Sequence, residues 1–456
     1  MTSPLDTSTD VDDSGQPWWR RAVRTTSRLE AVVVGAVATA WAVILASVLA
    51  HPLFVSHDSI SNNAHVWFIS RELWHHHQLP VHMPMLAHGK ALTFPYASVP
   101  WLVAALLRPL FGDWAVTLCL VGGFVALVVM MLWALPGLRR GWSAAAVLVN
   151  PALVMALLVG QVPFIWAAAF LFGAIGAWQR RRWWAATVLA GLAMITHAAV
   201  AGPMVAILVV IALAVTPDKR RLLGHAAVAA AVACPAALAV VMSPAFEQSS
   251  PSFRLMQILR IVVARGTVVG VPLALAWARS SGRARATRWQ LLAPAVLTGF
   301  VVLNAVLLGP MNRYAWGAPW RHPDERVMAL IDGPAFVPGA TYRVLGFSDG
   351  RVSMYRLIQH GAQLDGELFP ESQARHSWPE PHQYEQFLLD RRVDFVMAWT
   401  SYDIRWGTNE HALLTALGAR PTCDVGGVEV RRGFEGPRRS GEAPYEVFSV
   451  RPCPVT

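Results

Sequence analysis

The chain has 456 residues, of which 55% are hydrophobic and only 14% are charged, and its formal net charge is +10. Soluble globular proteins carry about 25% charged residues, so this composition excludes an ordinary soluble protein. The basic residues cluster between apolar runs, where they indicate membrane orientation and argue against nucleic-acid binding. We therefore expect an α-helical polytopic protein of the cell membrane.

Residues 1–26 are polar, and we expect them to form a disordered cytoplasmic N-terminus. No cleavable signal is predicted, because the first apolar run is long enough to cross a membrane. Further apolar segments follow within residues 27–310, the predicted transmembrane domain. The segments cover residues 29–51, 95–111, 114–136, 142–160, 162–178, 184–199, 201–216, 222–245, 257–278 and 289–308.

The basic clusters predict the orientation of these segments. By the positive-inside bias, the N-terminus is cytoplasmic, whereas the loop 52–94 and the residues after Pro310 are outside. This topology needs an odd number of crossings, so we expect about 9–11 spans. Either one of the two segments within 95–136 is re-entrant or lies along the interface, or Arg139 and Arg140 depart from the bias.

The external loop begins with FVSHDSISNNAHVWFISRELWHHHQLP, residues 54–80, in which His57 and Asp58 directly follow the first span. Ser61-Asn62-Asn63 predicts a helix start, and apolar residues at helical spacing within 64–78 predict a helix lying flat at the interface. A carboxylate at this depth costs free energy unless it is solvated or used, so Asp58 is a catalytic candidate. The sequence fits equally well a solvated Asp58 that caps the next helix.

Three consecutive histidines, His75 to His77, end this helix. Consecutive residues on a helix point about 100° apart, so these side chains cannot converge on one metal ion. We expect an exposed, titratable tract and no metal site. One of the three could still join His82 and His88 around a phosphate or a cation.

Two predicted turns, further along the chain, carry polar residues at the predicted outer face. The two apolar runs in VNPALVMALLVGQVPFIWAAAFLFGAIGAWQRRRWW, residues 149–184, meet at a hairpin that exposes Gln161. His197 falls at the next outer turn, so we expect Asp58, Gln161 and His197 at one membrane level. Each is also an ordinary residue for a membrane interface.

The stretch SPSFRLMQILRIVVARGTVVG, residues 250–270, contains arginines among apolar residues. Arg254 and Arg265 are eleven residues apart, close to three helical turns, and share one helix face, whereas Arg260 lies on the other side. A guanidinium group suits phosphate oxygens. The alternative is that the arginines only extend their charged ends toward the interface.

After Gly309 the composition becomes more polar, and residues 311–456 predict a soluble α/β or α+β domain. We expect strands at 341–347, 393–399, 427–432 and 445–450, and amphipathic helices at 382–392 and 409–419. If the last two strands are antiparallel neighbours, Cys423 and Cys453 could form a disulfide outside the cell. Two unpaired thiols are the alternative.

In this order, residues 29–310 resemble the GT-C superfamily of membrane glycosyltransferases, or a GT-C-like membrane protein of the same architecture. The features that carry the resemblance are the acidic loop after the first span, HGKALTFPYASVPW at 88–101, the NP…GQ hairpin within 150–182 and AGLAMITHAAVAGP at 190–203. His197 stands where many relatives have a lysine, and Asp58 stands alone where some branches have paired carboxylates.

The resemblance implies transfer of a hexosyl or pentosyl group from a polyprenyl-phosphate donor to a glycan or glycolipid acceptor of the cell envelope. Asp58 would be the general base. The residues implied to bind substrate or the leaving phosphate are His57, Lys90, Gln161, His197, Arg254 and Arg265. A divalent cation, Mg or Mn, assists some relatives, although no set of carboxylates here requires one.

Two other functions fit the same sequence features. One is a non-catalytic transporter, flippase or assembly factor for envelope lipids or polysaccharides, and the other is a polymerase-like ligase of lipid-linked glycans. Transporters commonly carry charges in the middle of their spans, and apart from Arg260 and Arg265 the predicted spans have almost none. This scarcity favours the enzyme.

Overall fold

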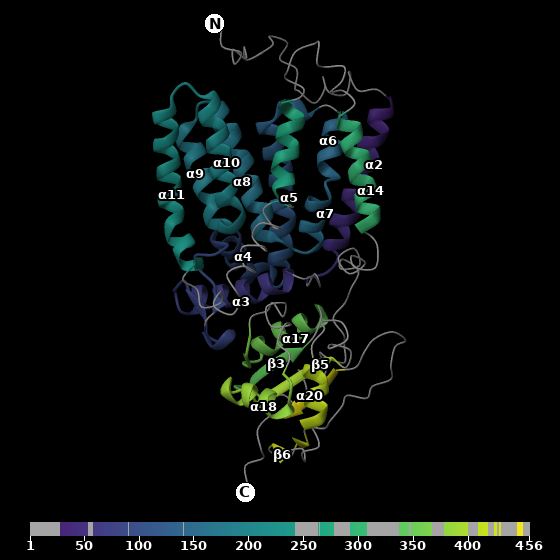
Figure 1. Ribbon diagram of the computed structural model, residues 1–456, viewed down its shortest axis with the longest axis vertical. Helices are drawn as coiled ribbons and strands as arrows, with labels where there is room; N and C mark the ends of the chain where they lie inside the picture. The colour runs from purple at the N-terminus through teal and green to yellow at the C-terminus, as the bar shows by residue number, and fades with distance from the viewer. Residues whose placement is uncertain are drawn as a thin grey trace.

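A computed structural model describes most of the membrane-associated part of the chain and a smaller share of its C-terminal part (Figure 1). The described residues are 28–52, 58–89, 91–139, 141–241, 263, 265–277, 292–307, 337–345, 348–366, 378–399, 409–417, 424–425, 428–429 and 445–449.

Apolar helices dominate the described residues. Four are long and apolar enough to cross a membrane: α2 (Arg28–Val48), α5 (Trp114–Ala134), α8 (Val162–Gln179) and α11 (Lys219–Val241). A bent pair, α6 (Gly141–Leu148) with α7 (Pro151–Leu158), raises the count to five. These helices support the expected helical, multi-pass membrane protein. The larger number of about 9–11 spans stays a prediction.

The same part contains further apolar helices of 14 to 18 residues. They are α4 (Ser98–Phe111), α9 (Trp183–Thr196), α10 (Ala198–Val215) and α14 (Leu292–Leu307), and residues 265–277 are also helical. Helix α4 packs on α3 (Ser59–His75) at the end of the bundle that faces the C-terminal strands (Figure 1). Of the two predicted segments within 95–136, the second is thus the long helix α5 and the first is the short helix α4.

Helices α5 and α8 pack closely because a glycine on each helix leaves room for a tryptophan side chain of the other. Trp166 of α8 lies over Gly123 of α5, and Trp133 of α5 lies over Gly176 of α8. The indole Nε1 of Trp166 donates to the carbonyl of Cys119 at 2.9 Å, so this side chain is held in place. Small residues at helix contacts are a common means of close packing in membranes.

We expect Gly123→Ala to lower the free energy of unfolding by about 1–3 kcal/mol, because overpacking strains a well-packed contact. A Cβ atom at this position would lie 2.6 Å from Nε1 of Trp166. Gly122→Ala is the matched control, since a Cβ there would meet nothing within 4 Å. Thermal unfolding of both variants in nanodiscs checks the prediction. Equal stability of the two variants would contradict it.

The predicted segment 142–160 is not one straight helix but two, bent by 47° between α6 and α7. Pro151 starts α7 and has no N–H to continue the helix. The Asn150 side chain accepts a hydrogen bond from the N–H of Ala152 at 3.0 Å, and Asn304 of α14 donates to the carbonyl of Val149 at 2.8 Å. Asn150 also contacts Thr267 at 3.4 Å, so the bend holds the helix that contains residue 265.

Helix α3 differs from the predicted helix in its start and in its burial, whereas its position at the membrane interface stays a prediction. It begins at Ser59 rather than at 61–63, and its buried residues lie on two sides of the helix. Val66 and Ile69 join the core of the bundle, whereas Ile60 and Phe68 join a second core shared with the C-terminal part. The C-terminal part covers the side of α3 that carries Ile60 and Phe68.

The C-terminal part contains a four-stranded sheet of order β4-β3-β5-β8. Strand β3 (Thr341–Leu345) is parallel to β4 (Gln363–Leu364) and β5 (Phe395–Trp399), and β8 (Tyr445–Ser449) is antiparallel to β5. Helix α17 (Ser348–Gln359) packs on one face of the sheet, while α18 (Pro381–Asp390) and α20 (Glu410–Leu417) pack on the other. We call residues 337–449 the C-terminal α/β segment.

The last two predicted strands, whose pairing was the condition for the disulfide, are not neighbours in the described sheets. Strand β7 (Val428–Glu429) pairs with β6 (Asp424–Val425), whereas β8 pairs with β5 over five residues. The edge of β5 offers β8 a longer ladder of backbone hydrogen bonds than the two residues of β7 could. Cys423 and Cys453 lie outside the described residues, so their disulfide stays a prediction.

Candidate active site

Asp58 lies at the start of α3, and its backbone holds it against the turn between α7 and α8. Its N–H donates to the carbonyl of Val159 at 2.9 Å. The Asn62 amide donates both to the Asp58 carbonyl at 2.8 Å and to the Gly160 carbonyl at 2.9 Å. The Asp58 carboxylate makes no capping hydrogen bond to α3. The structure therefore does not support the interpretation of Asp58 as a helix cap.

Asn62 connects this turn to α4 as well. Its side-chain oxygen accepts a hydrogen bond from Nε1 of Trp101 at 2.7 Å, and both side chains are buried. The Asn62 amide thus joins α3, the turn between α7 and α8, and α4. These hydrogen bonds fix the position of Asp58. The sequence pattern indicated Asn62 only as part of a helix start, and nothing in it pointed to Trp101.

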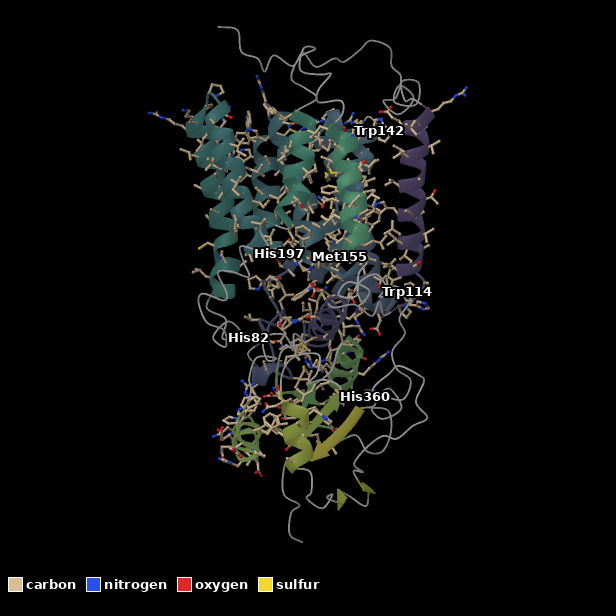
Figure 2. All side chains as sticks on the ribbon, turned by 45° about the vertical axis from the view of Figure 1, so that its right-hand side comes forward. His82, Trp114, Trp142, Met155, His197 and His360 are labelled. Carbon is tan, nitrogen blue, oxygen red and sulfur yellow. The ribbon has the colours of Figure 1, made fainter. Side chains whose placement is uncertain are left out.

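Arg265 and His197 lie in the bundle within electrostatic range of Asp58. The guanidinium Nη1 of Arg265 lies 3.4 Å from Nε2 of His197, and its Cζ lies 5.3 Å from the centre of the Phe164 ring. An arginine can only donate, so Nε2 of His197 accepts and the proton of the neutral ring is on Nδ1. The negative charge of Asp58 acts on both Arg265 and His197. His197 lies in the bundle, toward the end near the C-terminal α/β segment (Figure 2).

These three side chains come from parts of the sequence far apart, and the structure brings them together. Asp58 and Arg265 are half-buried, and His197 is buried. A carboxylate that can accept a proton thus lies near a guanidinium that can bind an anion. Such a pair can remove a proton from one group while stabilising negative charge on another.

The other predicted site residues have different outcomes. Gln161 lies at the start of α8, in the turn whose Val159 and Gly160 carbonyls hold Asp58 and Asn62. His57, Lys90 and Arg254 lie outside the described residues. His75 to His77 are exposed at the end of α3, and within the described ranges no group of three or more His, Cys, Asp or Glu residues is arranged to hold a metal ion.

A row of aromatic rings extends from Arg265 along the site, and the sequence did not predict it. Phe164 and Tyr96 pack edge-on against His197, with ring centres 6.3 Å and 6.2 Å away. Tyr96 also packs edge-on against Trp101 at 5.5 Å, and Trp101 stacks on His65 at 4.4 Å. Tyr96 and Trp101 belong to the stretch 88–101 quoted above, whereas no sequence signal marked Phe164 or His65.

The loop that leads to Tyr96 is attached to the C-terminal α/β segment. The N–H of Leu364 in β4 donates to the carbonyl of Met85 at 2.8 Å, and Leu86 pairs with Leu364 as an isolated parallel bridge. This loop therefore pairs with the outer edge of the sheet, at β4. His88 of the same loop lies 3.4 Å from the buried carboxylate of Asp365.

Asp365 is the centre of a buried ion cluster. Arg343 of β3 donates to it at 2.7 Å and Arg391 at 3.1 Å, and Arg343 also binds Glu410 at 2.8 Å. Burial opposes ionisation of Asp365, but the hydrogen bond with His88 and the charges of the two arginines outweigh it and lower the pKa of Asp365 to about 2. The cluster thus joins the loop to the sheet through an ionised carboxylate.

We expect this carboxylate to make stability depend on pH. A folded-state pKa below the unfolded value near 4 stabilises the folded state above about pH 5, and this stabilisation of about 2 kcal/mol is lost as pH falls toward about 2. Asp365→Asn should lower the melting temperature at pH 7 and flatten its decline on acidification, measured on the full chain in nanodiscs. Asp390→Asn, at an exposed position of α18, is the control. A wild-type acid response in Asp365→Asn would contradict the prediction.

Comparison with known proteins adds no further assignment to this geometry. No protein-family model, no curated protein and no solved structure matches the chain.

Proposed function

We propose that the chain is a membrane glycosyltransferase that moves a sugar from a polyprenyl-phosphate donor to a cell-envelope acceptor, with Asp58 as the general base. The observation that carries the proposal is the contact between Arg265 and His197 at one end of the bundle, with Asp58 within electrostatic range of both. The Asp58 carboxylate, which makes no capping hydrogen bond to α3, supplies the base that such a transfer needs. The guanidinium of Arg265 supplies the group that binds the anion.

In the proposed reaction, the acceptor hydroxyl oxygen attacks C1 of the sugar and the bond between C1 and the phosphate oxygen breaks. Asp58 takes the hydroxyl proton as the new bond forms. Arg265 donates hydrogen bonds to the leaving phosphate and stabilises the charge that develops on it. His197 accepts from Arg265 and helps to keep the guanidinium in place. The broken bond leaves polyprenyl phosphate as the second product.

The proposed orientation places this site at the outer face of the plasma membrane. Helix α2 starts and α8 ends at the end of the bundle away from the C-terminal α/β segment (Figure 1). Basic residues gather beside these helix ends, at Arg28 and Arg180 to Arg182. By the positive-inside bias, that end is cytoplasmic, so the N-terminus is inside and the C-terminal α/β segment outside. An acceptor from the envelope would then reach Asp58 from the side of the C-terminal α/β segment.

The proposal is tested with the purified full chain in nanodiscs and a set of polyprenyl-phosphate hexoses and pentoses. Glycosyl transfer to an envelope lipid or glycan extract, with release of polyprenyl phosphate, is the expected result. The competing function as a transporter or flippase predicts a different one. Movement of the intact donor across proteoliposomes, without cleavage of the sugar–phosphate bond, would contradict the enzyme.

A further inference from the structure

The proposed reaction restricts where the donor sugar can lie, and the following inference rests on that proposed function. The reacting carbon must lie between the base that activates the acceptor and the phosphate that leaves. With Asp58 as base and Arg265 at the phosphate, the sugar ring therefore lies beside the side chains that face both. Tyr96 lies at this place, because its ring packs edge-on against His197, whose Nε2 accepts a hydrogen bond from Arg265.

Tyr96 is also the accessible member of the aromatic row. It is half-buried, whereas Trp101 behind it is buried. An aromatic ring offers a broad apolar face together with a polar hydroxyl, which suits a sugar ring with its C–H face and its hydroxyl groups. Trp101 in turn is held by its hydrogen bond to Asn62 and by its stacking on His65.

Buried polar atoms without partners lie along the same row. Among the described residues, Nδ1 of His65, Oγ of Ser98 and Nδ1 of His197 have no hydrogen-bond partner. Burial lowers the pKa of His65 to about 4, so its ring is neutral at pH 7 and can both donate and accept. Buried polar groups are nearly always paired, so several unpaired ones beside one aromatic row indicate a place where a hydroxyl-bearing ligand supplies the missing bonds.

We propose that Tyr96, backed by Trp101, is the binding surface for the sugar ring of the donor and determines the preference for a glycosylated over a bare lipid phosphate. The position of Tyr96 is set by its loop. The N–H of Thr93 donates to the carbonyl of Val81 at 2.8 Å, and the N–H of Phe94 to that of Pro80 at 3.2 Å. The same loop pairs with the sheet of the C-terminal α/β segment at Leu364.

The test compares two ligands on the full chain in nanodiscs: a polyprenyl-phosphate sugar that the wild type transfers, and bare polyprenyl phosphate. Tyr96→Ala should weaken binding of the glycosylated donor about tenfold, the size of one lost aromatic contact, and leave binding of the bare phosphate within about twofold. Tyr96→Phe keeps the ring and should restore most of the preference. Phe164→Leu, at the ring that packs on Arg265, is the matched control and should weaken both ligands equally.

Equal weakening of both ligands by Tyr96→Ala would overturn the inference, because Tyr96 would then serve the phosphate or the fold. An unchanged preference in Tyr96→Ala would overturn it as well. If Tyr96→Ala does not fold, the ratio of the two affinities in Tyr96→Phe and in Tyr96→Leu decides: loss of preference only in the leucine variant supports the ring surface. A wild-type protein that binds both ligands equally would also overturn the inference, because there is then no preference for Tyr96 to determine. A wild-type protein that transfers sugar from none of the donors would instead contradict the proposed function.

Discussion

Asp58→Asn is expected to leave the protein folded and inserted in the membrane but to lower glycosyl transfer by about 10³-fold. The reason is that an amide cannot take the proton from the hydroxyl group of the acceptor. The fold should persist because the contacts that hold this position use the backbone. The N–H of Asp58 donates to Val159 and its carbonyl accepts from Asn62, and the side chain caps nothing. The measurement is product formation by the full chain in nanodiscs, together with its melting temperature.

The control for this variant is the replacement of His75 to His77 with alanine. These side chains are exposed at the far end of the same helix, so transfer should stay within a few-fold of the wild-type rate. A similar loss in both proteins would mean that the histidine tract has the role assigned to Asp58. Transfer by Asp58→Asn at a near wild-type rate, in a folded protein, would refute the assignment of the base.

Arg265→Gln is expected to weaken donor binding by about 10–100-fold, because hydrogen bonds to a charged group contribute about 1.5–3 kcal/mol. The glutamine amide keeps a donor but loses the charge and the planar fork of the guanidinium. Arg265→Lys keeps the charge and should lie between the two. Bare polyprenyl phosphate is the informative ligand here, since the loss should concern the phosphate rather than the sugar.

Arg108→Gln is the matched control for Arg265. Arg108 lies at the same end of the bundle, but it pairs with Asp113 at 3.1 Å and contacts Tyr355 of α17 at 3.4 Å. Its loss should lower the melting temperature by loosening the contact with the C-terminal α/β segment and leave donor affinity unchanged.

From the sequence, Arg254→Gln should behave like Arg265→Gln and Arg260→Gln should not. Equal donor affinity in all these variants would leave the arginines without a role in binding.

The site was predictable as a set of candidates but not as an arrangement. Asp58, His197 and Arg265 were identified from the sequence because each is a polar group in an apolar setting, where its presence has a cost. That Arg265 packs against His197 and Phe164 could not be predicted. Helical periodicity indicates which face of a helix is apolar, but it does not indicate which other helix lies against that face.

Asn62 and Tyr96 show the same limit more sharply. In the sequence, one is part of a helix start and the other part of a loop. Their roles arise from partners distant in the chain, such as Gly160 for Asn62 and His197 for Tyr96. A polar residue buried by tertiary contacts looks the same in sequence as one that faces water.

The sequence by itself determined that the chain is a helical membrane protein, because long apolar segments cannot remain in water and must satisfy their backbone hydrogen bonds internally. The tertiary structure decided the rest. It buried α3 on both sides, because the C-terminal α/β segment supplies the second apolar surface. It paired β8 with β5 rather than β7, because pairing depends on which strand edge is near in space. Contacts between distant segments depend on how the whole chain packs, and no local pattern encodes them.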